Sequence, residues 1–175
     1  MSEFKQNILQ LDKKFDPKAK RHYLNGFQIV LHCHHYTTLY TQLALDASET
    51  ELLADVAEES FLEVLKKYFI DNQIINLDEK IDLACQYFGA VGLGKMIVNY
   101  FGDDSGEVEL IVSHLDSGWI KKWGMYDKPV NYITVGFIQA MFSILCDKPI
   151  KTFKAIEIES IVRGAKTSIF KVHKV

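Results

Sequence analysis

Hydrophobic residues recur at helical spacing in two long stretches of the chain. Ser48-Glu49-Thr50-Glu51 has the capping-box pattern, and the apolar residues after it follow the i, i+3, i+4, i+7 rule: Leu52, Leu53, Val56, Ala57, Phe61, Val64, Leu65 and Tyr68. This stretch predicts an amphipathic helix that ends near Asp71. Residues 131–145 are apolar on nearly every side, which predicts a fully buried helix.

Three shorter helices are expected from weaker patterns. Thr37 or Thr38 is placed to cap a helix over residues 39–46, and Asp78 to cap another that continues to residue 88. Asp116 or Ser117 is placed in the same way before a short helix that contains Trp119 and Trp123.

Alternating and β-branched residues predict the strands. Asn25-Gly26 is a signal for a type I′ hairpin turn, because both central positions of that turn need positive φ, and it would join residues 21–24 to 27–31. Two further pairs are expected, 96–101 with 108–114 and 152–162 with 167–172. The prediction is an α+β fold in one domain over residues 1–175, a twisted antiparallel sheet of about four to six strands with packed helices.

Composition narrows the classes of function. Hydrophobic residues make up 48% of the chain and charged residues 25%, and the net charge of −3 argues against nucleic acid as the main partner. No apolar run approaches the roughly 20 residues that span a bilayer, so no membrane span is expected. The three cysteines are widely spaced without a CxxC pair, which favours free thiols and a cytoplasmic location.

The densest group of chemically active side chains is His32-Cys33-His34-His35-Tyr36, directly after the apolar residues 27–31. On a strand, the period of two places His32 and His34 on one face and Cys33 on the core face. On a helix, His32 would instead share a face with His35 and Tyr36. Alternation along residues 108–114 also turns His114 inward.

Two kinds of site are compatible with this group. One is the polar end of a ligand pocket, lined by His32, His34, His35, Tyr36 and His114, with Trp119 as an aromatic wall or part of a dimer surface. The other is a metal centre in which His32, His34 and His114 hold zinc or iron. There, Glu157 or Asp116 would complete the ligand set and leave a position open for water.

The last third of the chain has a recognisable order, a buried helix with Gly136-Phe137-x-x-Ala140, a short polar break and a closing strand pair. It resembles the 4-vinyl-reductase domain family, small-molecule-binding modules that share their fold with the vesicle-tethering TRAPP subunits. Many members close with Glu-x-x-Cys-x-x-x-Gly-x-x-x-Cys-x-Phe. The matching positions here are Glu157, Ser160, Gly164, Ser168 and Phe170.

The resemblance implies an apolar cavity for a hydrophobic or aromatic small molecule and frequent dimerisation. Members with both cysteines hold zinc at the closing hairpin, and serine is a poor zinc ligand, so no zinc is expected there. The leading hypothesis is a cytoplasmic, homodimeric, non-catalytic carrier or sensor whose pocket has a histidine-rich polar end. The alternatives are a metal-dependent enzyme that uses His32, His34 and His114, and a protein-interaction module.

Overall fold

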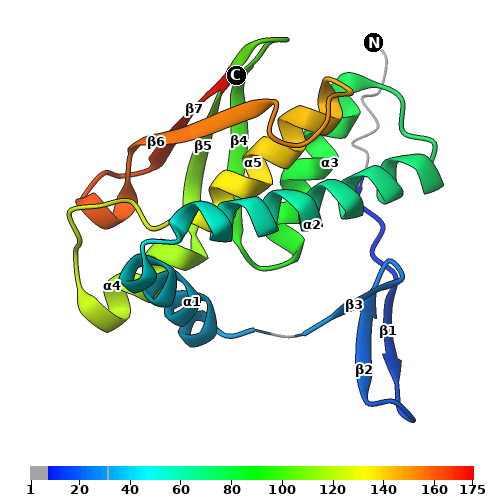
Figure 1. Cartoon of the computed structure of the whole chain (residues 1–175). Coiled ribbons are helices and arrows are strands. Elements are labelled where there is room, and N and C mark those ends of the chain that lie inside the picture. The colour runs from blue at the N-terminus through cyan, green and yellow to red at the C-terminus, as the bar shows by residue number, and fades with distance from the viewer. Residues whose placement is uncertain (1–7, 31) are drawn as a thin grey trace.

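The computed structural model of the chain describes residues 8–30 and 32–175. A three-stranded antiparallel sheet comes first, β1 (Lys13–Asp16), β2 (Arg21–Leu24) and β3 (Phe27–Ile29), and it extends away from the other elements (Figure 1). Asn25 and Gly26 have φ angles of 50° and 83°, and β2 pairs with β3 around them. The expected hairpin is therefore confirmed, but its second strand ends at Ile29 instead of continuing to residue 31, and Leu31 lies outside the described residues.

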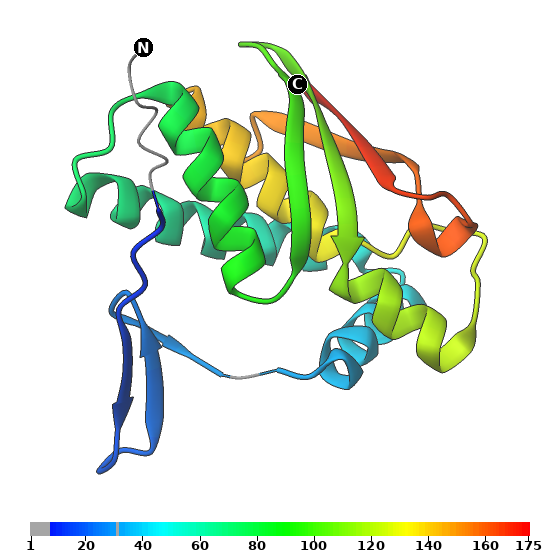
Figure 2. The ribbon, with the colours of Figure 1, turned by 180° about the vertical axis from the view of Figure 1, so that it is seen from behind.

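The second sheet is antiparallel, with strand order β4-β5-β7-β6. Its strands are β4 (Gly94–Phe101), β5 (Ser105–Ser113), β6 (Phe153–Glu159) and β7 (Ser168–Lys174). The helices are α1 (His34–Ala47), α2 (Thr50–Asp71), α3 (Leu77–Ala90), α4 (His114–Trp123) and α5 (Tyr132–Leu145). Helices α3 and α5 cover one face of this sheet, and α2 packs along α5 (Figures 1 and 2). The α+β prediction is confirmed.

Helix α5 forms the centre of the core, as its all-round hydrophobicity predicts. Phe137, Ile138, Met141 and Phe142 have no exposed surface and pack in one cluster with buried side chains of α2, α3 and the second sheet. Gly136 on the same helix faces α2, where an added Cβ would lie 2.2 Å from the carbonyl oxygen of Ala54. The two helices therefore approach closely at this point.

Several predicted helix starts are wrong. Helix α1 begins at His34 after an uncapped Cys33, and Thr37 and Thr38 lie inside it. The capping box does not form, because Ser48 ends α1 in the left-handed conformation (φ 59°) and Glu49 precedes α2 without a side-chain cap. The cap of α3 is Asn76 rather than Asp78: its Oδ1 accepts a hydrogen bond from the Glu79 amide at 3.0 Å.

The predicted inward face of 108–114 is interrupted by a bulge. Lys95 pairs with Val112 and Met96 with Leu110, so one residue of β5 is skipped and Val112 turns outward, 53% exposed. His114 is then the first residue of α4 rather than a strand residue. Ser113 caps this helix, which corrects the expectation for Asp116 or Ser117.

Cys33 is exposed, so its predicted place in the core is wrong. It is the extended residue directly before α1 and does not belong to a strand, so the alternation along the preceding residues does not extend to it. Cys85 and Cys146 are partly buried and pack against the main core cluster. Within residues 8–30 and 32–175, no helix has both the length and the apolar character needed to cross a membrane.

Candidate functional site

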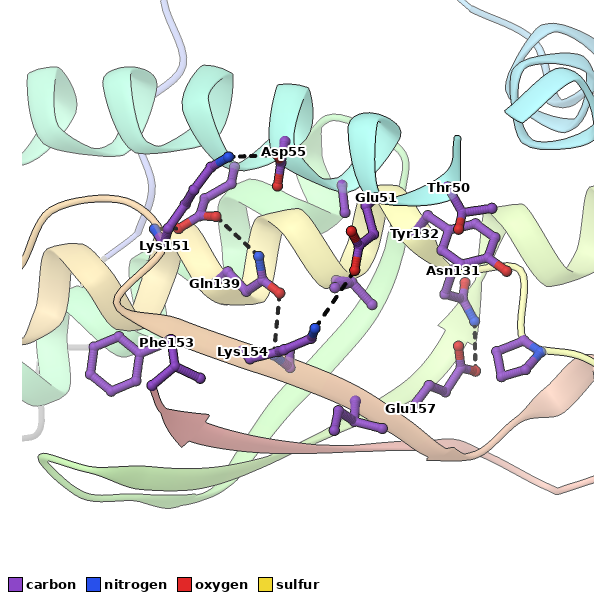
Figure 3. Close-up of a pocket in the computed structure, with 17 residues that line it drawn as sticks. Thr50, Glu51, Asp55, Asn131, Tyr132, Gln139, Lys151, Phe153, Lys154 and Glu157 are labelled. Carbon is purple, nitrogen blue, oxygen red and sulfur yellow. Dashed lines mark hydrogen bonds and ion pairs between the residues drawn. The ribbon is translucent and has the colours of Figure 1, made fainter. Parts of the chain in front are cut away.

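A groove of about 470 Å³ lies between α2, α5 and β6 (Figure 3). Much of its lining is apolar and comes from all three elements: Ala54, Val135, Phe153, Ala155 and Ile156. The alternation of β6 turns Phe153, Ala155 and Glu157 toward the helices and leaves Ile156 half exposed. The groove therefore follows directly from how one edge strand packs under two helices.

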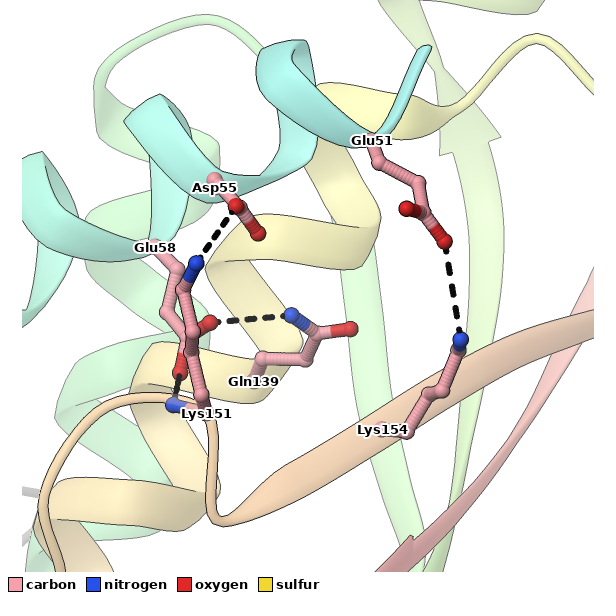
Figure 4. A network of polar contacts seen from close by, with 6 residues as sticks. All are labelled: Glu51, Asp55, Glu58, Gln139, Lys151 and Lys154. Atoms are coloured by element: carbon pink, nitrogen blue, oxygen red, sulfur yellow. Dashed lines mark hydrogen bonds and ion pairs between the residues drawn. The ribbon is translucent and has the colours of Figure 1, made fainter. Parts of the chain in front are cut away.

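Two ion pairs connect α2 with β6 and the residues before it across the groove (Figure 4). Lys151 Nζ lies 2.7 Å from Asp55 Oδ2, and Lys154 Nζ lies 3.7 Å from Glu51 Oε1. All four side chains are solvent-accessible, and exposed pairs of this kind contribute about 0–1 kcal/mol to stability. They therefore add little to the stability of this arrangement.

A buried carboxylate fixes one end of the groove. Glu58 on α2 is 1% exposed, and its Oε2 accepts a hydrogen bond from Gln139 Nε2 at 3.0 Å. Its Oε1 accepts one from the Lys151 amide at 2.8 Å, and Gln139 Oε1 accepts one from the Ala155 amide at 3.2 Å. With both oxygens paired, this network joins α2, α5 and β6 and has a structural role.

A second buried polar network lies at the other end, where Asn131 and Glu157 line the groove. The Nδ2 of Asn131 donates to Glu157 Oε1 at 2.9 Å and to Asp116 Oδ2 at 2.7 Å. The Oδ1 of Asn131 accepts from the Ser113 hydroxyl at 2.9 Å, and Asp116 Oδ1 accepts from the Val162 amide at 3.1 Å. A single amide thus connects two buried carboxyl groups.

Glu157 differs from Glu58 in having an oxygen without a partner. Burial raises the pKa of Glu157 from 4.5 to about 7, although the neighbouring Ser160 and Ser168 hydroxyls and the Asn131 amide act to lower it, while Asp116 raises it further. Among the described residues, neither Oε2 of Glu157 nor Oγ of Ser160 has a hydrogen-bond partner. Near neutral pH this carboxyl is therefore partly protonated, with the Ser160 and Ser168 hydroxyls beside it.

The same cluster shows how the zinc position of the 4-vinyl-reductase family differs here. Glu157, Ser160 and Ser168 come together as the resemblance implies, but two of the three donors are hydroxyls, which bind zinc poorly. Within the part of the chain that the structure describes, no group of three or more His, Cys, Asp or Glu side chains is placed to hold a metal ion. The residues present do not fit zinc.

The histidine group is divided in space. The ring centroids of His34 and His35 are 4.2 Å apart, and those of His34 and His114 are 6.2 Å apart. Partial burial, then His35, Lys121 and His114, hold the pKa of His34 below its ordinary value. His32 lies apart from them, with its ring edge-on to those of Tyr36 and Tyr40.

Trp119 is buried between Trp123 and Tyr126, at centroid distances of 4.6 and 5.0 Å, in a small second core cluster. The groove between α2, α5 and β6 is lined by none of the six ligand residues that the sequence proposes. Their role in ligand binding, and that of His32, His34 and His114 as ligands to zinc or iron, stay predictions.

Comparison with known proteins places the fold. No family model matches the chain, and no curated protein matches it in sequence. The phenol-responsive sensory domain of the transcription activator PoxR, solved with phenol, matches with a TM-score of 0.78 at 13% identity, over 93% of this chain and 84% of that one. The chain therefore shares its fold with this sensory domain.

Two further solved structures match with lower scores. Subunit 3 of the trafficking protein particle complex from Naegleria fowleri, covalently bound to palmitic acid, matches with a TM-score of 0.53 at 12% identity, over 81% of this chain and 91% of that one. A vinyl-4-reductase family protein from Methanocaldococcus jannaschii has a TM-score of 0.47 at 15% identity, over 70% and 68% of the two chains. At these identities the likeness concerns the fold.

Sequence reasoning missed most of the groove, since Ala54, Val135 and Ala155 are ordinary core-type residues in three separate elements. One signal was present in the sequence. Phe153, Ala155 and Glu157 alternate along a strand, so a strand that buries its two apolar residues also turns the glutamate inward. An inward carboxyl at the end of an apolar strand face marks this end of the groove.

Proposed function

We propose that the chain is a non-catalytic binding domain, of carrier or sensor type, for a hydrophobic or aromatic small molecule that enters the groove between α2, α5 and β6. The observation that carries this proposal is an apolar groove that ends at the buried carboxyl of Glu157. Ligand sites commonly combine apolar walls with a few placed polar groups. The PoxR sensory domain, which has this fold and was solved with phenol, supports the same ligand class.

The chemistry of Glu157 favours a neutral ligand that carries a hydroxyl group. Because Oε1 already accepts the Asn131 amide, a proton on this carboxyl belongs on Oε2, which then acts as a donor. A phenol or alcohol hydroxyl both donates and accepts, so it pairs with either protonation state of Glu157. A ligand carboxylate would meet the negative charge of Glu157 whenever that buried group is ionised.

Filling the groove tests the proposal. Val135→Trp on α5 places an indole in the lined volume and is expected to weaken binding of phenol or an alkylphenol at least tenfold in a calorimetric titration, a change of about 1.4 kcal/mol. Val112→Trp is the matched control, because Val112 is 53% exposed on β5 and does not line the groove. Equal affinities for both variants and the wild type would place binding elsewhere, and a wild type that binds none of these compounds would refute the ligand class.

A further inference from the structure

The three-stranded sheet at the start of the chain extends away from the other elements, and the turn between β1 and β2 is its outer end (Figures 1 and 2). Five exposed cationic side chains lie on these two strands and their turn and are here named the basic arm: Lys13, Lys14, Lys18, Lys20 and Arg21. Among the residues that the structure describes, none of the five belongs to an ion pair. Their charge is therefore available to a partner.

The net charge of the whole chain conceals this distribution. Residues 12–22 contain five of the 20 Lys and Arg but only two of the 23 Asp and Glu, a net charge of +3, so the rest of the chain carries −6. The carboxylate of Asp16 faces into the turn, where its Oδ1 accepts the amides of Lys18 at 2.8 Å and Ala19 at 3.0 Å. A basic arm on an acidic body favours a polyanion that meets the arm alone.

The arm is an ordered ribbon, not a loose tail. At its base, Leu24 is 4% exposed and belongs to the main core cluster, which anchors β2 to the body. Towards its outer end the rings of Phe15 and His22, which are partners in the register of β1 and β2, have centroids 4.7 Å apart. The strands therefore hold the cations in place before a partner arrives, which lowers the entropy cost of binding.

The cations are distributed around the ribbon. Alternation along β1 places Lys13 on one face and Lys14 on the other, and Arg21 shares the face of Lys14 through its partner Asp16. Lys18 and Lys20 lie in the turn. A flat anionic surface would meet only one face or the turn, whereas a groove with negative charge on both walls would meet all three. The major groove of B-DNA has phosphates along both edges, is about 12 Å wide and admits a two-stranded ribbon.

We propose that the basic arm binds double-stranded DNA by placing the β1–β2 ribbon in the major groove, with its lysine and arginine side chains against the backbone phosphates. Contacts to phosphates do not depend on base sequence. The acidic body lies outside the groove, because the arm extends away from it (Figure 1). Counterion release drives such binding, and five neutralised phosphates give a slope of about −4.5 for the logarithm of the binding constant against the logarithm of the salt concentration.

Fluorescence anisotropy of a labelled duplex of about 20 base pairs, titrated with the full chain between about 20 and 100 mM KCl, tests this contact. The wild type should bind saturably with the slope given above. Replacing Lys18, Lys20 and Arg21 together with glutamine should reduce the slope to about −2 and weaken binding at least tenfold at the lowest salt concentration. The matched control makes the same change of charge at three exposed body residues outside the ion pairs: Lys66→Gln, Lys95→Gln and Lys166→Gln.

The control variant should bind the duplex as the wild type does. Lys18→Arg with Lys20→Arg keeps both charges and should retain wild-type affinity, which separates the loss of charge from a change in the turn. A wild type without saturable binding at the lowest salt concentration, or equal affinities for the two glutamine variants, overturns the proposal.

Vesicles that contain phosphatidylserine give a second comparison, since polybasic segments also bind anionic lipid. Arm-dependent binding to these vesicles, with none to the duplex, would overturn the proposal in favour of a membrane surface. The affinity for phenol should be the same in the wild type and in the arm variants, because no residue of the basic arm lines the groove between α2, α5 and β6. Failure of the DNA contact would therefore leave the groove proposal intact.

Discussion

Replacing Glu157 with glutamine will make the protein more stable than the wild type at about pH 8 and leave the two equally stable at about pH 4. In the folded wild type, burial raises the pKa of this carboxyl from 4.5 to about 7. Between these values the unfolded chain has released a proton that the folded chain retains. The wild type therefore loses stability as pH rises through this window, at up to about 1.4 kcal/mol per pH unit and about 3 kcal/mol in total.

Glutamine keeps an oxygen for the Asn131 amide but does not ionise, so the variant should lack this pH dependence. Urea unfolding followed by circular dichroism at several pH values measures the difference directly. Glu159→Gln, on the same strand but exposed, should follow the wild-type curve. Parallel curves for wild type and Glu157→Gln would show that this carboxyl ionises normally in the folded protein.

Gly136→Ala should destabilise the fold by about 3 kcal/mol. The added Cβ would lie 2.2 Å from the Ala54 carbonyl oxygen, 2.7 Å from Ala57 Cβ and 2.8 Å from the Glu58 amide nitrogen. Two of these three atoms belong to the backbone of α2, so no side-chain rotation relieves the contact. Helices α2 and α5 must move apart, which also disturbs both walls of the groove.

Ser143→Ala is the matched control on the same helix. Ser143 is fully buried and its hydroxyl has no partner among the described residues, so the change creates no clash and leaves no partner unpaired. Its urea midpoint should lie near that of the wild type, while the midpoint of Gly136→Ala falls clearly below both. Similar midpoints for the two alanine variants would mean that the contact between α2 and α5 can accommodate a methyl group at position 136.

Much of the fold follows from local patterns in the sequence. Residues 131–145 are hydrophobic all round and become the central helix α5, and Asn25-Gly26 forms the turn that its φ preference requires. The beginning of α1 could not be read this way, because its inward face consists of threonines and its apolar stripe faces outward. A hydrophobic pattern identifies the buried face of a helix only if the apolar residues of that helix are the buried ones, and in α1 they are not.

The candidate site was less predictable for a different reason. Asn131 contacts Asp116 and Glu157, which lie 15 and 26 residues away along the chain, and no local motif encodes such a contact. The histidines are neighbours in sequence, yet the start of α1 separates His32 from His34. Closeness along the chain therefore suggested a site at the histidines, whereas the fold brings Asn131, Asp116 and Glu157 together from separate parts of the chain.

The central claim is that a small aromatic molecule binds between α2, α5 and β6. Titration of isotope-labelled protein with phenol, followed by amide and methyl NMR shifts, tests it most directly. The account predicts saturable shifts concentrated at Ala54, Val135 and Ala155, with Glu157 affected at the inner end. Shifts centred instead on His34, His35 and His114, or the absence of any saturable shift with phenol and its alkyl derivatives, would contradict it.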